Sequence, residues 1–178
     1  MQCAAFLKAI NVGGHVVKMD RLRAIFAELG YANAETVIAS GNVLFETRAR
    51  DMAPVERKLA AGLEAALGYA VPTFVRTASE VATIAEATPF PRKAMDNAFV
   101  VNVGFLDQPL GRDAAATMRR LTTENDEFHT EGREFWWLCH TRQSESPFFK
   151  VRFEKAFGAD VTFRNLNTVR RMAERMAH

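Results

Sequence analysis

Strand-like and helix-like segments follow one another in the same order in both halves of the chain, and this repeat constrains the fold more than any other feature. Short apolar and β-branched runs alternate with stretches whose apolar residues recur at helical spacing. The pair Gly41-Asn42 between two short runs is typical of a tight hairpin turn. The first half is expected to contain a strand over 2–9, a helix over 19–29, strands over 36–39 and 43–45, a helix over 51–67 and a strand over 71–75.

The second half repeats this order without residue-level identity to the first. Its expected elements are a strand over 98–106, a helix over 111–121, strands over 124–129 and 133–139, a helix over 146–157 and a strand over 161–163. A further amphipathic helix follows over about 166–176. The order βαββαβ is that of a ferredoxin-like unit. The pattern therefore predicts an α+β protein made of two tandem ferredoxin-like βαββαβ units with antiparallel sheets, plus a C-terminal helix.

A boundary between the halves is expected near residue 88. A short helix over 79–87, capped by Ser79, is followed by the proline-rich stretch 88–93, whose prolines disfavour regular structure. We therefore expect a first domain over 1–88, with the short helix trailing it, and a second domain over 89–178, which includes the C-terminal helix.

Cysteine usage and the lengths of the apolar runs favour a cytoplasmic protein. The chain has 178 residues and a formal net charge of +2, so no strongly basic balance indicates a nucleic-acid partner. We expect no signal peptide and no membrane span, because no apolar run has the length of either. Cys3 and Cys139 lie in strand-like runs and are expected to be buried thiols of a reducing compartment. The four histidines have no metal-ligand spacing, so we expect no metal and no cofactor.

Topology brings two polar segments of the first half together. In a βαββαβ sheet with right-handed crossovers the spatial strand order is 4-1-3-2. The first strand then ends beside the start of the third. The loop 11–15 should therefore lie next to the hairpin turn 40–42, at the same end of the sheet.

The loop between the first strand and the first helix has two interpretations. Asn11, Gly13, Gly14 and His15 occupy the position of phosphate-binding loops, in which glycines let backbone N–H groups face an anion at a helix N-terminus. The loop matches neither of the usual glycine-rich phosphate motifs. The same residues also suit a tight turn in which the glycines adopt a positive φ and Asn11 caps the local backbone.

The hairpin turn allows the same two interpretations. Ser40, Gly41 and Asn42 are explained by turn chemistry, or Ser40 and Asn42 donate hydrogen bonds to a bound group. Ser40 would act as a nucleophile only beside a base, and His15 is the histidine that the topology brings near.

Three further residues complete the candidate ligand-binding set. Lys8 ends the first strand next to these loops, where it is either a surface lysine or an anion contact. Arg164 is a candidate anion partner, and Asn165 is either the N-cap of the last helix or a ligand contact. The last helix also presents Arg170, Arg171 and Arg175 on one face, which is either a solvated surface or a contact for phosphates of nucleic acid.

Three sequence blocks resemble a bacterial family, the domain of unknown function 1697. They are FLKAINVGG at 6–14, TVIASGNVLF at 36–45 and TFRNLNTV at 162–169. The resemblance extends over essentially the whole chain and implies two ferredoxin-like units in tandem, but no activity. The family usually has Arg at position 8, Tyr at 37, Gln at 39 and Trp at 166, whereas this chain has Lys, Val, Ala and Leu. These differences weaken any interpretation in which those positions stack on a base or bind a phosphate bidentately.

These observations favour three functions in decreasing order. The first is a binding protein with a polar loop pocket for a small anionic or nucleotide-like ligand. The alternative is a nucleic-acid-binding module that uses the basic C-terminal region, which remains an analogy at the level of the fold. The third is an enzyme, although no carboxylate pair, metal cluster or Cys–His arrangement indicates which residues would be catalytic.

Overall fold

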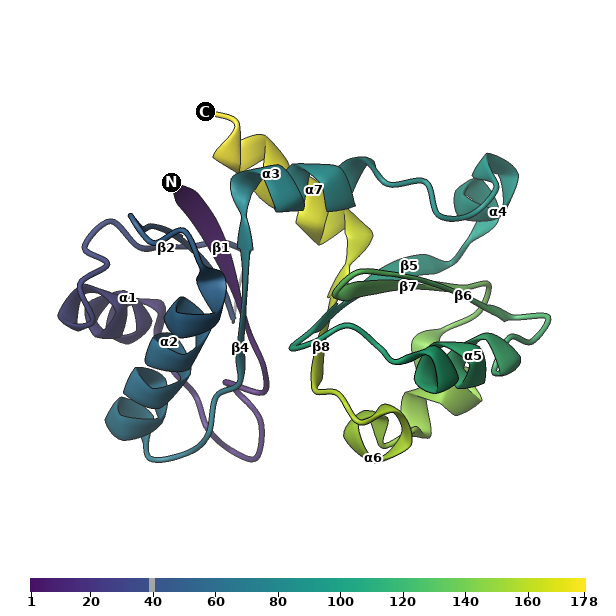
Figure 1. Cartoon of the computed structure of the whole chain (residues 1–178), viewed down its shortest axis with the longest axis horizontal. Helices are drawn as coiled ribbons and strands as arrows, with labels where there is room; N and C mark the ends of the chain where they lie inside the picture. The colour runs from purple at the N-terminus through teal and green to yellow at the C-terminus, as the bar shows by residue number, and fades with distance from the viewer. Residues whose placement is uncertain (39–40) are drawn as a thin grey trace. The chain divides into compact units, whose positions relative to one another are not determined.

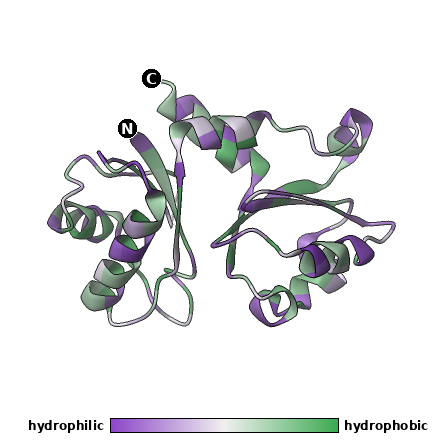
Figure 2. Ribbon diagram, viewed as in Figure 1, coloured by the Kyte–Doolittle hydropathy of each residue, from purple (hydrophilic) through white to green (hydrophobic). Residues whose placement is uncertain are grey.

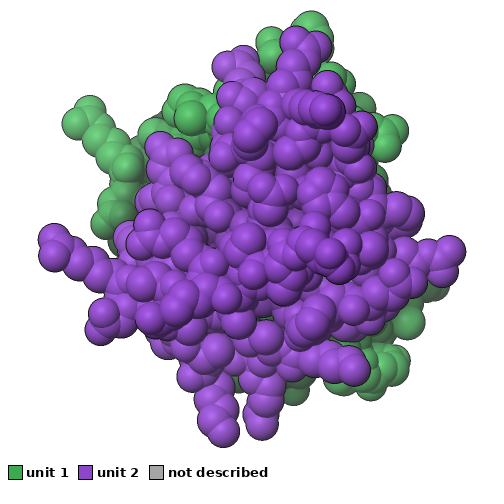
Figure 3. Space-filling model, turned by 90° about the vertical axis from the view of Figure 1, so that its right-hand side faces the viewer, with its two compact units in different colours: residues 1–85, 168–178 green, residues 86–167 purple. Residues whose placement is uncertain are grey.

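The computed structural model describes residues 1–38 and 41–178 and shows an α+β protein with two four-stranded antiparallel sheets (Figure 1). The chain divides into two compact units. The first comprises Met1–Ala85 with Thr168–His178, and the second comprises Glu86–Asn167 (Figure 3). Each unit contains one of the two sheets.

The first sheet has the strand order β2-β3-β1-β4, which is the predicted order 4-1-3-2 read from the other edge. Strand β1 is central and pairs with β3 and with β4, in both cases antiparallel. The elements of this half are β1 (Gln2–Leu7), α1 (Met19–Glu28), β2 (Glu35–Thr36), β3 (Asn42–Glu46), α2 (Met52–Leu67), β4 (Thr73–Thr77) and α3 (Ala78–Glu86).

Alternation along β1 directs Cys3, Ala5 and Leu7 to the face of the sheet that α1 and α2 cover. Both helices carry apolar and polar residues along their length (Figure 2), and their apolar stripes complete this core. The helical core residues include Leu22, Ile25 and Phe26 of α1 and Val55, Leu59 and Leu63 of α2. The core therefore fixes α1, and with it the loop that precedes α1, against one end of the sheet.

The predicted ends of α2 are confirmed. The side chain of Asp51 accepts a hydrogen bond from the backbone N–H of Ala53 at 3.0 Å, so Asp51 is the N-cap. Gly68 ends the helix in the left-handed conformation, with φ of 83°.

The second sheet has the equivalent strand order β6-β7-β5-β8. Its core is rich in aromatic rings from the strands and from the segment that precedes β8, including Phe135, Trp137 and Phe148. The elements are α4 (Arg92–Asn97), β5 (Val100–Leu106), α5 (Arg112–Arg120), β6 (Asp126–Glu131), β7 (Glu134–Cys139), the 3₁₀ helices η1 (Gln143–Glu145) and η2 (Pro147–Lys150), α6 (Phe153–Phe157), β8 (Val161–Asn165) and α7 (Leu166–Met176).

Two expectations around residues 79–93 are wrong. Helix α3 begins at Ala78, and Thr77 rather than Ser79 caps it: the Thr77 hydroxyl accepts from the Glu80 N–H at 3.3 Å, and the Glu80 carboxylate accepts from the Thr77 N–H at 2.7 Å. The proline-rich stretch also ends in regular structure, because α4 starts directly after Pro91. A proline at the start of a helix removes only an N–H that would have no helical partner.

The helix expected over 146–157 is two separate helices. Ser146 caps η2 by accepting from the Phe148 N–H at 3.1 Å, as an N-cap before proline should. The chain then extends at Val151 and Arg152 before α6 begins. Bringing Phe148 and Phe153 onto the sheet requires this break, and it leaves Phe149 at the surface.

The first hairpin is shorter than expected. The run 36–39 was predicted as a strand, but β2 ends at Thr36, and Ile38 has a positive φ of 51°, which is incompatible with an extended strand. Residues 39 and 40 lie outside the described part of the chain.

The C-terminal segment from Thr168 onwards groups with the first unit, whereas the whole C-terminal helix was expected in the second domain. Val169, Met172 and Met176 are buried, and the Arg170 side chain donates to the Ala85 carbonyl at 3.2 Å. The end of the chain is thus grouped with, and hydrogen-bonded to, the unit where the chain started.

Cys3 and Cys139 are buried thiols, as predicted. Among the described residues, no helix has both the length and the apolar character needed to cross a membrane.

Candidate functional site

The loop after β1 and the turn before β3 adjoin in the structure. The Leu7 N–H donates to the Gly41 carbonyl at 2.7 Å, directly beyond the paired residues Phe6 and Asn42. Between the two segments lies a cavity of about 380 Å³, lined by Ile10, Asn11, Val17, Lys18, Met19, Leu22, Thr36 and Gly41. We call this space the loop cavity.

Hydrogen bonds and stacking hold the loop in shape. The Asn11 side-chain oxygen accepts from the Val17 N–H at 2.8 Å, which closes residues 11–17 into a compact turn. Gly13 and Gly14 both have a positive φ, 68° and 84°, so their glycine identity is required by the backbone. His15 stacks on Tyr69 with ring centroids 3.9 Å apart.

The Tyr69 hydroxyl in turn donates to the carbonyl of Ile10 at 2.6 Å, so Tyr69 fixes both ends of the turn. Asn11, Gly13, Gly14 and His15 therefore all contribute to the architecture of the loop, and of these four only Asn11 lines the cavity.

Two residues beside the cavity have strained backbone. Ala9, in the loop, has a φ of 55°, and Ile38, in the hairpin, has a φ of 51°. Residues with a Cβ rarely adopt this conformation, and for a β-branched residue such as Ile38 it is a clear outlier. Backbone strain of this kind concentrates at binding and catalytic sites.

The N-terminus of α1 forms one wall of the cavity. Lys18 is the N-cap residue, and no side chain of the described residues caps the helix there. The first helical hydrogen bond runs from the Leu22 N–H to the Lys18 carbonyl at 3.1 Å, so the preceding N–H groups have no helical acceptor. The helix dipole and the Lys18 ammonium together make this wall electropositive. The nearest acidic side chain of the first turn, Asp20, is ion-paired with Arg23.

The hairpin residues contribute through their backbone. Gly41 lines the cavity and has a φ of 101°. Asn42 is only 3% exposed, and its amide donates to the Val37 carbonyl at 3.2 Å while the Val37 N–H donates to the Asn42 carbonyl at 2.9 Å. The Asn42 side chain therefore closes the hairpin from inside. Ser40 lies outside the described residues.

Lys8, Arg164 and Asn165 do not line the loop cavity. Lys8 is half-buried, and its N–H donates to the Pro72 carbonyl at 2.9 Å. Arg164 and Asn165 belong to the second unit, so their part in a shared site stays a prediction. Burial lowers the pKa of Arg164 to about 10, and its guanidinium donates to the Thr162 hydroxyl at 2.9 Å and the Phe163 carbonyl at 2.7 Å.

Asn165 has the capping role that the sequence suggested as one of its two interpretations. Its side-chain oxygen accepts from the Asn167 N–H at 2.9 Å, at the start of α7.

Six residues of the cavity wall were not among the predicted site residues: Ile10, Val17, Lys18, Met19, Leu22 and Thr36. Lys18 could have been found, because it directly precedes the predicted helix and is therefore at the position that faces an anion. Thr36 could not have been found, because it was expected to lie in a strand that continued to residue 39, whereas β2 ends at Thr36. In the part of the chain that the structure describes, no group of three or more His, Cys, Asp or Glu side chains is placed to hold a metal ion.

Comparison with known proteins gives a family and a fold. The model of the family described as "Protein of unknown function (DUF1697)" matches residues 1–136. A solved structure of a conserved bacterial protein from Streptococcus pneumoniae is similar over 98% of each chain, with a TM-score of 0.77 and 22% sequence identity. No curated protein matches the sequence significantly.

Proposed function

Because the chain belongs to the family of proteins of unknown function DUF1697, whose name carries no activity, we propose a function from the geometry of the site. The protein binds a small anionic, nucleotide-like ligand in the loop cavity. The observation that carries this proposal is that one cavity of about 380 Å³ is bounded by an uncapped helix N-terminus, by Lys18 and by the backbone of two converging turns. This volume lies within the usual range for small-molecule sites, about 300–1,000 Å³.

The anionic group of the ligand would occupy the α1 end of the cavity. There the N–H groups of the first turn and the Lys18 ammonium supply donors and positive charge. The apolar part would contact Ile10, Leu22 and the half-exposed Met19, which line the same space. This division into a charged end and an apolar wall is what favours a nucleotide-like molecule over a bare inorganic anion.

We also propose a fold class and a cellular compartment for the protein. Each unit is a ferredoxin-like βαββαβ unit, and the chain carries two of them in tandem; the element order and the two equivalent strand orders support this assignment. A cytoplasmic location is supported by the two buried, free thiols, and a bacterial source by the similarity to a conserved bacterial protein.

Calorimetric titration with inorganic pyrophosphate and with AMP tests the binding function. We expect saturable binding of both, with AMP tighter because it also contacts the apolar wall. Lys18→Gln should weaken both affinities about fivefold, corresponding to about 1 kcal/mol for a charge at a helix N-terminus.

Lys93→Gln is the matched control, because Lys93 is an exposed lysine of α4 in the other unit. It should leave both affinities unchanged. Absence of saturable binding by either anion, or equal loss in the two variants, would contradict the proposed site.

The nucleic-acid alternative depends on the three arginines of α7, two of which have partners within the protein. Of the three on α7, Arg170 donates to the Ala85 carbonyl and Arg175 is ion-paired with Glu35, which leaves Arg171 as the basis of the alternative. Salt-dependent binding of a single-stranded oligonucleotide that Arg171→Gln weakens would favour it over the small-ligand site.

A further inference from the structure

The second unit contains an aromatic cavity that the proposed function does not use. Its volume is about 240 Å³, and it lies between the sheet and the segment that joins β7 to α6. Five of its seven lining residues are aromatic, and one is polar. They are Trp137, Gln143, Phe148, Phe149, Val151, Phe153 and Phe163. We call this space the aromatic cavity.

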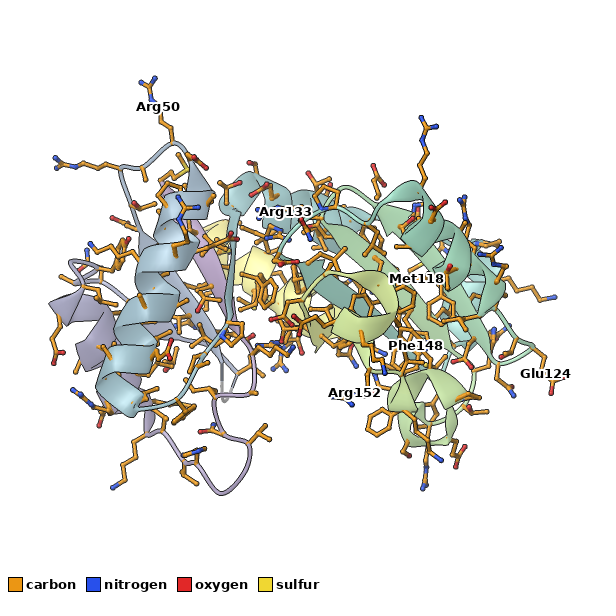
Figure 4. The ribbon with its side chains drawn as sticks, turned by 60° about the horizontal axis from the view of Figure 1, so that its bottom comes forward. Arg50, Met118, Glu124, Arg133, Phe148 and Arg152 are labelled. Carbon is orange, nitrogen blue, oxygen red and sulfur yellow. The ribbon has the colours of Figure 1, made fainter. Side chains whose placement is uncertain are left out.

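Phe148 forms the innermost wall of the cavity. It is 6% exposed and lies inside the unit, whereas Arg152 and Glu124 point outward at its surface (Figure 4). Its ring meets the ring of Trp137 edge-on, with centroids 4.8 Å apart, and those of Phe153 and Phe163 at 6.4 Å. These edge-to-face contacts fix the walls in place, so the cavity exists before any ligand arrives.

The outer wall exposes apolar surface to water. Phe149 is 59% exposed, and Val151, Phe153 and Phe163 are only partly buried. Rotating Phe149 inward would remove its apolar surface from water. The capped turn of η2 prevents this, because it holds the backbone so that Phe148 is buried and Phe149 stays outside. A concave surface of this kind, apolar and preformed, is typical of small-molecule sites.

The polar character of the cavity is limited to one amide. The Gln143 side chain forms no hydrogen bond with any described residue, although it lines the cavity and is half-buried. The nearby cationic residues Lys150 and Arg152 are exposed and do not line it. The wall therefore presents ring faces and one hydrogen-bonding group, and no charge.

We propose that the aromatic cavity binds a small, uncharged, planar aromatic molecule, about the size of a bicyclic ring, with one hydrogen-bonding group directed at Gln143. An apolar cavity of about 150 Å³ binds benzene, so about 240 Å³ accommodates a second fused ring. Offset and edge-on contacts with the surrounding rings favour a flat aromatic ligand over a branched aliphatic one. This site is independent of the loop cavity, because all of its residues lie in the second unit.

Indole is the probe, and the two tryptophans provide the readout. Trp137 lines the cavity, and its indole N–H donates to Asp126 at 2.8 Å. Trp136 directly precedes it in the strand and therefore points to the opposite face of the sheet. The ¹H–¹⁵N spectrum of the labelled protein therefore contains two tryptophan indole N–H signals, one from the site and one from the opposite face of the sheet. We expect titration with indole to shift the Trp137 signal saturably and to leave that of Trp136 in place.

Two variants and a control complete the test. Val151→Phe fills the cavity and should weaken indole binding at least tenfold, and Phe149→Ala should weaken it several-fold by removing one wall. Phe99→Ala changes an equally exposed phenylalanine of the same unit that does not line the cavity, and should leave the affinity unchanged.

Overturning the proposal requires either a Trp137 signal that stays fixed up to the solubility limit of indole, or indole binding that Val151→Phe leaves intact. The proposed anion site is tested independently, because pyrophosphate and AMP are titrated without indole and the expected change in their affinities comes from Lys18.

Discussion

Cys3 and Cys139 show how a buried residue couples stability to pH. Burial raises the pKa of Cys3 to about 11, and burial together with the neighbouring Asp126 carboxylate raises that of Cys139 to about 12. In the unfolded chain both thiols ionise near pH 9. The native state therefore holds these protons more tightly than the unfolded state does.

The free energy of unfolding should consequently be unaffected by these thiols below pH 8 and should fall as the pH rises above 9. Urea unfolding from pH 7 to 10.5 measures this fall, and the double variant Cys3→Ala, Cys139→Ala should show a shallower one. In the native protein at pH 8, both thiols should also resist an aromatic disulfide reagent until urea is added. Rapid native labelling would show that they are not buried as described.

Asn102 is a buried polar residue whose replacement should stabilise the protein. It is 3% exposed, lies opposite Trp137 in the sheet, and its amide nitrogen has no hydrogen-bond partner among the described residues. A buried donor without a partner costs about 1–3 kcal/mol. Asn102→Leu, of similar volume, should therefore raise the free energy of urea unfolding by about 1 kcal/mol.

Asn97→Leu is the control for this substitution, because Asn97 is exposed at the end of α4. It should change the unfolding free energy by less than about 0.5 kcal/mol. A loss of stability in Asn102→Leu would mean that the amide is hydrogen-bonded in solution.

At the residue scale, the sequence predicted where the site residues lie better than it predicted what their side chains do. Asn11, Gly41 and Asn42 lie at the junction that topology indicated, but the Asn42 side chain faces inward to close its hairpin. Which face a side chain takes at a turn depends on the local φ of its neighbours, here the positive φ of Ile38 and Gly41, and the pattern of residue types does not encode this.

At the scale of elements, Gly104 decides how β5 packs. A Cβ on Gly104 would lie 2.1 Å from the nearest ring carbon of Phe135, which is fully buried on the neighbouring strand. The missing side chain therefore provides the space in which that ring lies against the sheet.

Gly104→Ala should destabilise the protein by about 2–3 kcal/mol, because the Phe135 ring is held by its neighbours and cannot move aside. Gly111→Ala is the control, since a Cβ there meets nothing within 4 Å. Its cost in chemical unfolding should be well below that of Gly104→Ala. Equal effects would show that the Phe135 ring is not fixed in place.

Elements with strong periodicity and clear caps were predictable, and short ones were not. The boundaries of α2 follow from Asp51 and Gly68, whose capping chemistry is local. The break between η2 and α6 is set by packing of Phe148 and Phe153 against the sheet, which outweighs the helical spacing of the phenylalanines.

At the scale of the molecule, the residues from Thr168 onwards group with the first unit, where the Arg170 side chain donates to the Ala85 carbonyl at 3.2 Å. Val169, Met172 and Met176 are buried, and fully burying an apolar side chain of this size contributes about 1.5–3 kcal/mol. A chain that ends at Asn167 would expose the surface that these residues cover.

Removing residues 168–178 should therefore destabilise the first unit more than the second. Hydrogen exchange measured by mass spectrometry should show faster exchange mainly within residues 1–85, while peptides from 86–167 keep their protection. Deleting only Ala177 and His178 is the control and should change little. Equal loss of protection in both units would contradict the grouping.

Strand order was the most predictable property of the whole chain. The order 4-1-3-2 followed from the element sequence and the handedness of crossovers, and the described sheet of the first unit has it. This order places the loop after β1 beside the β2–β3 turn, so the approximate location of the loop cavity followed as well. Its walls at Lys18 and Thr36 depended on where α1 starts and β2 stops, which pattern alone leaves open by a few residues.

A ¹H–¹⁵N titration of the backbone amides with AMP tests the proposed binding site most directly. Saturable shifts should be confined to the residues that line the loop cavity, and should be largest in the first turn of α1, at Asn11 and at Gly41. Amides that do not move at millimolar AMP, or that move only elsewhere in the protein, would contradict the account.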